Sequence, residues 1–319
     1  MSMLEINNLS LEIKIGGRDY NALDGISFSL DHGEIVGIAG ESGAGKSLTA
    51  HSIMGLLPAG ARVSAGEVLL EGRKISGLSE AELCSIRGKE LSVIFQEPMT
   101  ALNPLITVGN QVGEAFLQHH KRSRSEAYQR VLGIMADTGL SRPESLYHEY
   151  PHRLSGGMRQ RIAIAMAMVN KPKALIADEP TSALDVTIQC QILEMIRSLS
   201  SEQGSAVLLI SHDISVLRTI CSRMMILYAG QIVEEGAAGD ILNDPLHPYT
   251  RGLMESIPNQ GKKGALLHSI PGSAMPLTRR SHAGCAFASR CAYVSPACGE
   301  DRPGMITTGG RHVRCFMYR

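Results

Sequence analysis

Short apolar segments that end in glycine or in acidic residues mark the first two thirds of the chain. Leu4–Ile15 alternates loosely between apolar and polar residues, Gly16–Gly17 follows as a turn, and Ala22–Leu30 continues the alternation. This pattern predicts two strands joined by a turn. Glu34–Ala39 and Ala174–Glu179 are short, mainly apolar runs, as expected of central strands covered on both faces. The pattern therefore predicts an α/β domain.

The first of these apolar runs leads into a glycine-rich segment. Residues 40–47 read Gly-Glu-Ser-Gly-Ala-Gly-Lys-Ser, and a stretch compatible with a helix follows to about Leu57. A strand, this spacing of glycines and lysine, and a helix are typical of a phosphate-binding loop, whose N–H groups attract phosphate. We expect Lys46 to reach the β- and γ-phosphates and Ser47 to ligate Mg²⁺. The predicted nucleotide-binding residues are Gly40, Glu41, Ser42, Gly43, Ala44, Gly45, Lys46, Ser47 and Leu48.

Acidic side chains stand at the end of the second apolar run. Ala174–Glu179 ends in Asp178 and Glu179, and a parallel strand that is otherwise apolar tolerates acids at the end that faces the ligand crevice. We expect Asp178 to hold Mg²⁺, mostly through water, and Glu179 to polarise the attacking water as general base. A further predicted strand, Ser205–Ser211, is followed by His212, for which we predict a γ-phosphate contact.

A second candidate anion site lies between the two halves. Residues 153–161 read Arg-Leu-Ser-Gly-Gly-Met-Arg-Gln-Arg and precede the apolar helix predicted for Ile162–Val169. Ser155, Gly156 and Gly157 would offer a capping hydroxyl and N–H donors at the start of that helix. By the pattern alone, an ordinary helix N-cap is the simpler interpretation.

Six motifs together resemble the ATP-binding cassette of ABC transporters, over about Leu4–Gly236. In order, these motifs are Gly40–Ser47, Gln96 within Phe95–Pro98, Leu154–Gln160, Ala174–Glu179, Ser182–Asp185 and His212. The resemblance implies a P-loop NTPase cassette at residues 1–236, with a mixed-sheet core, an antiparallel β subdomain and a helical subdomain at about 105–169.

The resemblance also implies roles that spacing alone does not. Ser155, Gly156, Gly157 and Gln160 would serve the ATP of a partner cassette, because two cassettes close head to tail around two ATP molecules. Gln96 would sense Mg²⁺ and the γ-phosphate, and would share the catalytic work with Glu179 and His212. Asp185 would cross the dimer seam.

The adenine-stacking position departs from the pattern of the family. Cassettes usually carry an aromatic residue in the first strand region, whereas the aligned positions here are Ile13 or Ile15. Tyr20 is the nearby aromatic residue. It is therefore the candidate for the adenine contact, with an ordinary strand residue as the alternative.

Composition separates the C-terminal part of the chain from the rest. The 319 residues carry 31 Lys and Arg against 31 Asp and Glu, so no whole-protein field would attract nucleic acid. Lys262–Arg319 nevertheless holds nine basic residues against Glu300 and Asp301, a net charge of +7. The longest apolar run, Ile162–Val169, has eight residues, whereas a spanning helix needs roughly 20. The start of the chain lacks the pattern of a signal peptide, so we expect a cytosolic protein.

Four of the seven cysteines lie in this basic segment: Cys285, Cys291, Cys298 and Cys315. Disulfides are disfavoured in a reducing cytosol, and structural zinc usually uses more closely spaced pairs. Four thiolates at wide, irregular spacing suit a [4Fe-4S] cluster, whose negative charge the basic residues would offset. Zinc remains the alternative. The similarity to peptide-importer ATPases, many of which share such a tail, favours the cluster within an extension over residues 237–319.

The resemblance implies a function in transport. Asp244–Thr250 is similar to a segment that marks the oligopeptide, dipeptide and nickel importer branch. The chain would be an ATPase that uses ATP and Mg²⁺ to power peptide import, bound peripherally at the cytoplasmic face of the bacterial inner membrane. Its partners would be a second homologous ATPase, two permease subunits and a periplasmic solute-binding protein. Nickel chelates, opines or another small solute are alternative cargoes. A soluble ABC ATPase is disfavoured, because the chain has one cassette and no long coiled coil.

Overall fold

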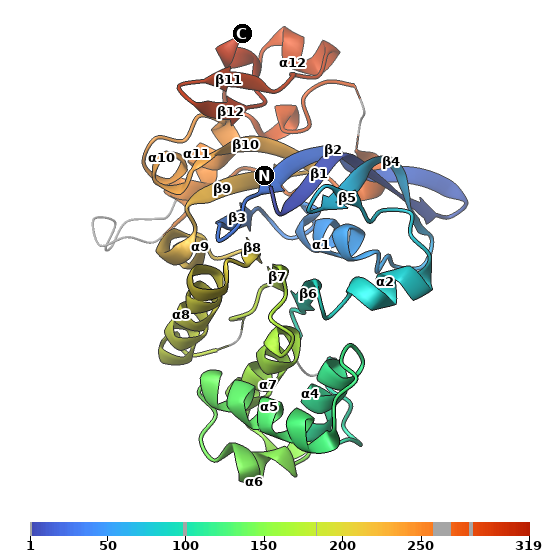
Figure 1. Ribbon diagram of the computed structural model, residues 1–319. Coiled ribbons are helices and arrows are strands. Elements are labelled where there is room, and N and C mark those ends of the chain that lie inside the picture. The colour runs from blue at the N-terminus through green and yellow to red at the C-terminus, as the bar shows by residue number, and fades with distance from the viewer. Residues whose placement is uncertain (1, 98–100, 183, 258–268, 281–282) are drawn as a thin grey trace. The chain divides into compact units, whose positions relative to one another are not determined.

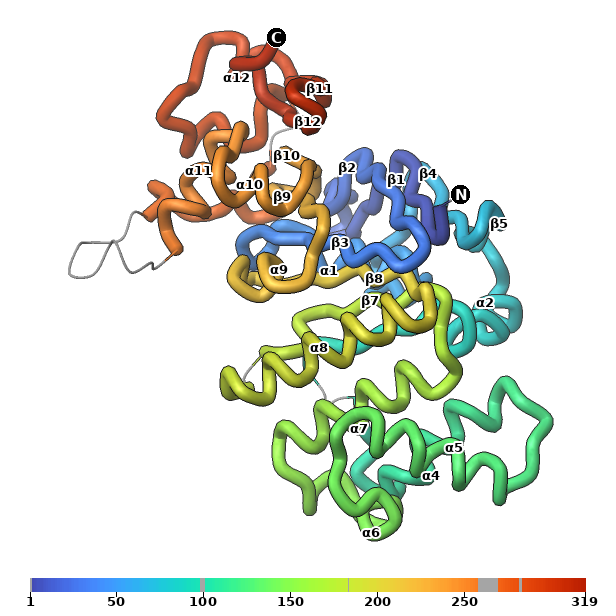
Figure 2. Tube along the Cα trace, turned by 60° about the vertical axis from the view of Figure 1, so that its left-hand side comes forward, coloured from blue at the N-terminus to red at the C-terminus, as the bar shows by residue number. Residues whose placement is uncertain are grey.

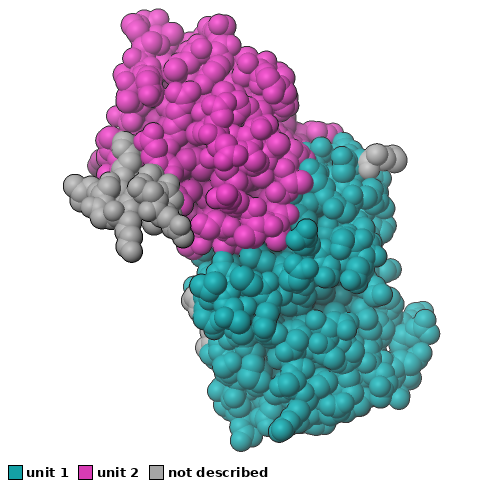
Figure 3. Space-filling model, turned by 90° about the vertical axis from the view of Figure 1, so that its left-hand side faces the viewer, with its two compact units in different colours: residues 1–5, 29–35, 69–210 teal, residues 6–28, 36–68, 211–319 magenta. Residues whose placement is uncertain are grey.

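Figure 1 shows the structure of the protein, a computed structural model that describes residues 2–97, 101–182, 184–257, 269–280 and 283–319. Its internal contacts separate two compact units, coloured differently in Figure 3. Unit 1 comprises Met1–Glu5, Ser29–Ile35 and Leu69–Ile210. Unit 2 comprises Ile6–Phe28, Val36–Val68 and Ser211–Arg319. Each unit therefore combines segments that are far apart in the sequence.

Three parallel strands form the centre of unit 1. They are β6 (Leu91–Ile94), β7 (Ala174–Asp178) and β8 (Ala206–Ile210), in the order β8-β7-β6. All five residues of β7 and all five of β8 are buried. The continuously apolar runs thus form covered parallel strands, as the sequence predicted.

Helices make up most of the remainder of unit 1. Those described are α2 (Glu80–Ile86), α4 (Val108–Leu117), α5 (Arg124–Asp137), α6 (Pro143–Tyr147), the short 3-10 helix η1 (Pro151–Arg153), α7 (Gly156–Met168) and α8 (Val186–Gln203). Ser79 begins α2 and Ser123 begins α5 with a capping box, in which each serine pairs with a glutamate three residues on. Helices α4, α5 and α7 pack against one another, within the range 105–169 predicted for a helical subdomain.

Two sheets contribute to unit 2. The first has the order β2-β1-β4, formed by β1 (Leu4–Ile15), β2 (Arg18–Leu30) and β4 (Ala61–Leu70). The two-residue strand β5 (Arg73–Lys74) pairs antiparallel with the end of β4 within unit 1. The first two strands match the alternating segments of the sequence.

The second sheet of unit 2 joins the phosphate-loop strand to the C-terminal extension. The strands of this sheet that lie in unit 2 have the order β11-β12-β10-β9-β3. They are β3 (Ile35–Ala39), β9 (Arg223–Tyr228), β10 (Gln231–Ala237), β11 (Ile306–Thr308) and β12 (Arg311–Val313). β3 and β9 are parallel, whereas β10, β12 and β11 add antiparallel, with Glu234 opposite Val313. The last strands of the extension therefore continue a sheet of the cassette, as Figure 2 shows beside β10.

Short helices complete unit 2. They are α1 (Lys46–Met54), α9 (Ile214–Ile220), α10 (Ala238–Asn243), α11 (Pro248–Glu255), α12 (Pro296–Glu300) and the 3-10 helices η3 (Leu277–Arg279), η4 (Ala288–Arg290) and η5 (Phe316–Tyr318). Among the helices of the described residues, none has the length and apolar character needed to cross a membrane.

Candidate nucleotide site and cysteine cavity

The phosphate-binding loop lies in unit 2, between β3 and α1. Lys46 is the first residue of α1, and its side chain is folded back onto the loop. The Lys46 Nζ donates to the backbone carbonyl oxygens of Gly40 at 2.8 Å and of Glu41 at 3.2 Å. Lys46 is only 7% exposed, so its positive charge is held inside the loop that is expected to bind phosphate. Ser47 and Leu48, which follow it, are half-buried.

Two glycines of this loop are required for different reasons. Gly40 has φ +156°, and a Cβ there would lie 2.3 Å from the backbone oxygen of Leu227. Gly43 has φ +78°, yet a Cβ there would meet no atom within 4 Å. Gly40 therefore permits a close approach of two backbones, whereas Gly43 supplies only a left-handed conformation.

The loop also contacts three residues from the C-terminal part of the chain. Arg290 pairs with the Glu41 carboxylate, the backbone N–H of Glu41 donates to the Tyr249 hydroxyl, and Arg280 donates to the Gly43 carbonyl. Sequence reasoning missed all three. The available signals were the position of Tyr249 in the importer-like segment and that of Arg290 directly before Cys291.

The predicted catalytic carboxylate lies in unit 1, at the end of β7. Gln96 Nε2 donates to Glu179 Oε2 at 2.9 Å, so the structure brings these two predicted catalytic residues together. Glu179 has φ +48°, a strained conformation for a residue with a side chain, and its N–H donates to the Ile210 carbonyl of β8 at 2.9 Å. Asp178, the last residue of β7, is 4% exposed. The strand end thus presents Glu179 in a fixed orientation.

The glycine-rich segment before α7 also lies in unit 1. Ser155 is the N-cap of α7, and its hydroxyl accepts the Met158 N–H at 3.3 Å. Gln160 Nε2 donates to the Pro180 carbonyl at 2.5 Å, which ties α7 to the segment after β7. Asp185 caps α8 by accepting the Ile188 N–H at 3.0 Å. These side chains have structural roles inside the chain, and their roles toward a partner cassette stay predictions.

Two further predicted residues lie in unit 2. Tyr20 is a half-buried residue of β2, and His212 is exposed in the turn before α9. His212 is followed by Asp213, which caps α9 by accepting the Ser215 N–H at 2.8 Å. The adenine contact of Tyr20 and the phosphate contact of His212 remain predictions.

All four cysteines of the extension line one cavity of about 240 Å³ in unit 2. Burial raises the pKa of Cys285, Cys291 and Cys315, and the charge of neighbouring cysteines raises it further. Backbone N–H groups two residues further on, at Phe287, Tyr293 and Met317, act in the opposite direction. The Tyr293 N–H lies 3.3 Å from Cys291 Sγ, and the Ser295 hydroxyl lies 3.4 Å from Cys298 Sγ.

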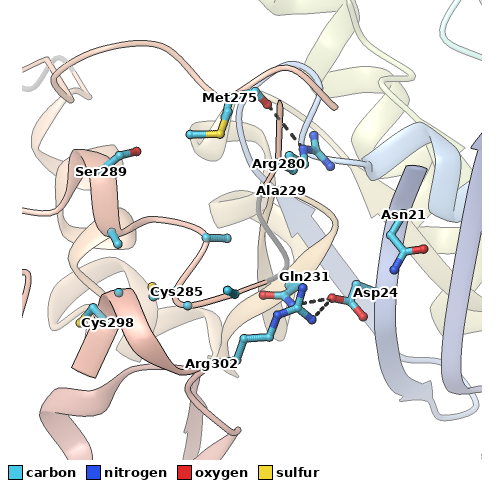
Figure 4. A pocket seen from close by; sticks show the side chains of 15 residues that line it. Asn21, Asp24, Ala229, Gln231, Met275, Arg280, Cys285, Ser289, Cys298 and Arg302 are labelled. Atoms are coloured by element: carbon cyan, nitrogen blue, oxygen red, sulfur yellow. Dashed lines mark hydrogen bonds and ion pairs between the residues drawn. The ribbon is translucent and has the colours of Figure 1, made fainter. Parts of the chain in front are cut away.

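A second cavity, of about 190 Å³, shares Cys285 and Cys298 with the first (Figure 4). On its other side Asp24 of β2 accepts hydrogen bonds from Arg302 at 2.5 Å and from Gln231 at 2.9 Å. The pair of Asp24 and Arg302 joins the extension to the first sheet within unit 2.

The donor set and the cavity fit a group bound by thiolates, but a ligand geometry is not confirmed. All seven cysteines are described, and none forms a disulfide. Within the described ranges, no cluster of three or more His, Cys, Asp or Glu side chains is placed to hold a metal ion. The structure therefore gathers the predicted cysteines without arranging their sulfur atoms as ligands.

Comparison with known families identifies the fold. The family model of ABC transporters matches residues 23–182, which contain the phosphate-binding loop and the end of β7. The chain belongs to the ABC transporter family. The model of the C-terminal region of oligopeptide/dipeptide transporters matches residues 233–298, which include Tyr249, Arg290 and three of the four clustered cysteines.

Relatives of this ABC protein align over nearly its whole length. It is 44% identical to the oligopeptide transport ATP-binding protein AppD of Bacillus subtilis (strain 168), over 99% of this chain and 97% of that protein. It is also 44% identical to the dipeptide transport ATP-binding protein DppD of the same organism, over 99% and 94%. Among solved structures, a dimeric post-hydrolysis state of the ATP-binding cassette MJ0796 with ADP and Pi matches with a TM-score of 0.68. That match has 31% identity and covers 74% of this chain and 99% of the other. The predicted cassette fold is thereby confirmed.

Proposed function

We propose that this ABC protein binds Mg²⁺–ATP and hydrolyses it to power the import of peptides. The observation that carries the proposal is the similarity, over nearly the full chain, to proteins named for oligopeptide and dipeptide transport. The match to the oligopeptide/dipeptide C-terminal region supports the same branch. The chain would lie at the cytoplasmic face of the inner membrane, with two permease subunits, a second homologous ATPase and a periplasmic solute-binding protein as partners.

The residues divide the chemical work between phosphate binding and water activation. Lys46 would meet the β- and γ-phosphates, and Ser47 and Asp178 would hold Mg²⁺, which neutralises charge on the phosphates. Glu179 would take the proton of the attacking water, and its hydrogen bond from Gln96 fixes the direction in which the carboxylate points. His212 would contact the γ-phosphate, and Tyr20 would stack on adenine.

The second ATP site would be completed by another cassette. Ser155, Gly156, Gly157 and Gln160 would face the ATP of that partner, and Asp185 would cross the seam. The N-terminal end of α7 suits an anion, because its first N–H groups have no partner within the helix.

The catalytic assignment is tested with Glu179→Gln in the assembled transporter. Transition-state stabilisation by one such group is worth about 100-fold or more, so this variant should bind ATP while losing most hydrolysis and peptide uptake. The control is Glu202→Gln, on an exposed position of α8. Hydrolysis by Glu179→Gln at the wild-type rate would exclude Glu179 as the base. Uptake of nickel chelates or opines in place of peptides would refute the proposed cargo.

We also propose that Cys285, Cys291, Cys298 and Cys315 hold a [4Fe-4S] cluster. Supporting this, the four thiols share one cavity, and neighbouring cysteines raise the pKa of Cys285, Cys291 and Cys315, so a positively charged iron centre would relieve the repulsion between thiolates. Protein purified without oxygen should contain about four iron atoms per chain and absorb visible light. Stoichiometric zinc with no visible absorption would instead establish a zinc site.

A further inference from the structure

The phosphate-binding loop is contacted by residues that follow the cassette motifs in the sequence. Glu41 and Gly43, inside the loop, contact Tyr249, Arg280 and Arg290, and all five residues belong to unit 2. None of these three contacts is part of the G-x-x-x-x-G-K-S pattern. One of them places an arginine side chain beside a loop that is expected to bind phosphate.

Arg290 forms a bidentate ion pair with the Glu41 carboxylate through both terminal nitrogens of its guanidinium. The Arg290 Nη1 lies 2.8 Å from Glu41 Oε2, and the Arg290 Nη2 lies 3.0 Å from Glu41 Oε1. The remaining nitrogen, Nε, donates to the Pro271 carbonyl at 2.8 Å. The Arg290 side chain is only 6% exposed, whereas the Glu41 side chain is 27% exposed, so the pair is partly buried and salt can still reach the carboxylate.

The guanidinium is further fixed by aromatic rings. It lies 5.9 Å from the ring centres of Tyr228 and of Phe287. The rings of Tyr228, Phe287 and Tyr249 pack on one another, with centroids 4.6 to 5.5 Å apart. Tyr249 is fully buried, and its hydroxyl accepts the Glu41 N–H at 2.8 Å. Both the carboxylate and the backbone of Glu41 are therefore anchored.

The charge of Glu41 explains why an anchor is needed. A carboxylate inside a phosphate-binding loop repels the triphosphate, and this repulsion is strong where water is excluded. The bidentate pair with Arg290 neutralises the carboxylate and turns it toward the extension. In addition, Lys46 donates to the Glu41 carbonyl at 3.2 Å, so a displaced Glu41 would also disturb the lysine that meets the phosphates.

We propose that Arg290 is a positioning residue for nucleotide binding, which neutralises and orients Glu41 so that the phosphate-binding loop accepts ATP. This inference rests on the proposed binding of ATP at the loop. Arg290 does not touch the nucleotide; it acts through Glu41. The C-terminal extension is then a part of the nucleotide site and not only an appendage to it.

The test measures equilibrium binding of a fluorescent ATP analogue with Mg²⁺ to the full chain. Arg290→Ala should raise the Kd about 10- to 100-fold, because it leaves an unpaired carboxylate beside the phosphates. In a Glu41→Gln background, where no carboxylate remains, Arg290→Ala should change the Kd less than about twofold. Arg290→Lys keeps the positive charge but cannot form the bidentate pair, so its Kd should lie between those of the wild type and Arg290→Ala.

A matched control lies in the same extension. Arg311 pairs with Asp244 at 3.0 Å, and its side chain is 12% exposed. Arg311→Ala should keep the wild-type Kd, since this pair does not contact the loop. Thermal melts of each variant show whether it folds, and the effect of Arg290→Ala should shrink as salt rises, which a purely structural defect would not do.

The outcomes separate this inference from the proposed function. If the wild type binds ATP but Arg290→Ala binds it equally well, the inference is wrong and the proposed function stands. An equal loss in the Glu41→Gln background, or in Arg311→Ala, would also overturn it. If the wild type binds no better than Lys46→Ala, both the proposed function and the inference fail.

Discussion

The two halves of the predicted ATP chemistry are supported in different ways. At the end of β7 in unit 1, Glu179 is oriented by Gln96 and by the neighbouring strand β8. In unit 2 the phosphate-binding loop is held by Tyr249, Arg280 and Arg290, all from the C-terminal part of the chain. The contacts of the predicted catalytic carboxylate thus come from the cassette itself, whereas those of the loop come in part from the extension. The sequence motif thus identifies the residues of the loop, but not the distant residues that hold the loop in place.

The largest effect should come from filling the closest backbone contact of the loop. Gly40→Ala would place a Cβ 2.3 Å from the Leu227 oxygen, so the loop must shift and ATP binding should be lost. Gly43→Ala is the comparison variant, because no atom of the chain lies within 4 Å of a Cβ at that position and, within the chain, the left-handed conformation costs about 1–2 kcal/mol. Calorimetric titration with ATP compares the two. Equal losses would show that conformation alone, and not close approach, governs the loop.

Lowering the pH should destabilise α11, whose residue Tyr249 contacts the phosphate-binding loop, before it affects the end of β7. Burial, and then the charge of Arg251, lower the pKa of His247 to about 3 from its usual 6.5. His247 Nδ1 accepts the Tyr249 N–H at 3.1 Å, so protonation would break the N-cap of α11. Between about pH 6.5 and 3 the unfolded chain binds a proton that the folded chain does not, so stability is complete above this window and falls as pH falls.

This pH effect can be measured by hydrogen exchange. At pH 5 the expected loss is about 2 kcal/mol, and it should appear in α11 and the strands of unit 2 rather than in β7. His247→Asn keeps a capping oxygen without a titrating group and should remove the dependence. Equal loss of protection in both units would refute the assignment to His247.

An intermediate effect is expected at the contact that orients Glu179, the predicted catalytic carboxylate. Gln96→Ala removes the amide that donates to Glu179 at 2.9 Å, and should lower turnover about tenfold while ATP affinity changes little. This variant is the counterpart of Arg290→Ala, for which affinity should change first. Steady-state hydrolysis and equilibrium binding measure both. A Gln96→Ala variant with weakened ATP binding and normal turnover would contradict the assignment of turnover to the Gln96 contact and of affinity to the Arg290 pair.

The smallest effect should come from one hydroxyl. Tyr249→Phe keeps the aromatic packing but removes the acceptor of the Glu41 N–H, which is worth about 1 kcal/mol, or a few-fold in ATP affinity. Tyr293→Phe, at a half-exposed tyrosine of the cysteine cavity, serves as control. Identical affinities for wild type and Tyr249→Phe would show that the Arg290 pair alone is sufficient.

The sequence predicted the fold and the phosphate-binding loop because both depend on local patterns of residues. Buried parallel strands such as β7 and β8 are recognisable as short apolar runs, and the phosphate-binding loop by its glycine spacing. The supports of the loop could not be predicted in this way. Arg290 resembles any other basic residue of a basic segment, and its partner Glu41 is identified only when the chain is folded.

The N-caps of α7 and α8 could be predicted from the sequence only in part. Ser155 and Asp185 were assigned to a partner cassette by resemblance, yet each also caps its own helix. One side chain can serve both purposes, because a capping oxygen occupies the end of the helix where N–H groups remain open to an anion. The sequence pattern predicted the N-cap at Ser155 but not the one at Asp185, and the roles of both side chains toward a partner cassette stay predictions.

The pair of Glu41 and Arg290 also has a consequence for biosynthesis. The two residues are 249 positions apart, so translation of most of the chain separates the appearance of the loop from that of its anchor. Domains begin to fold as they leave the ribosome, and contacts between distant residues form late. A nascent chain that carries all six cassette motifs would therefore hold Glu41 without its counter-charge. High affinity for ATP would arise only after residue 290 has emerged, which delays the nucleotide-bound form until the cysteine-rich segment is present.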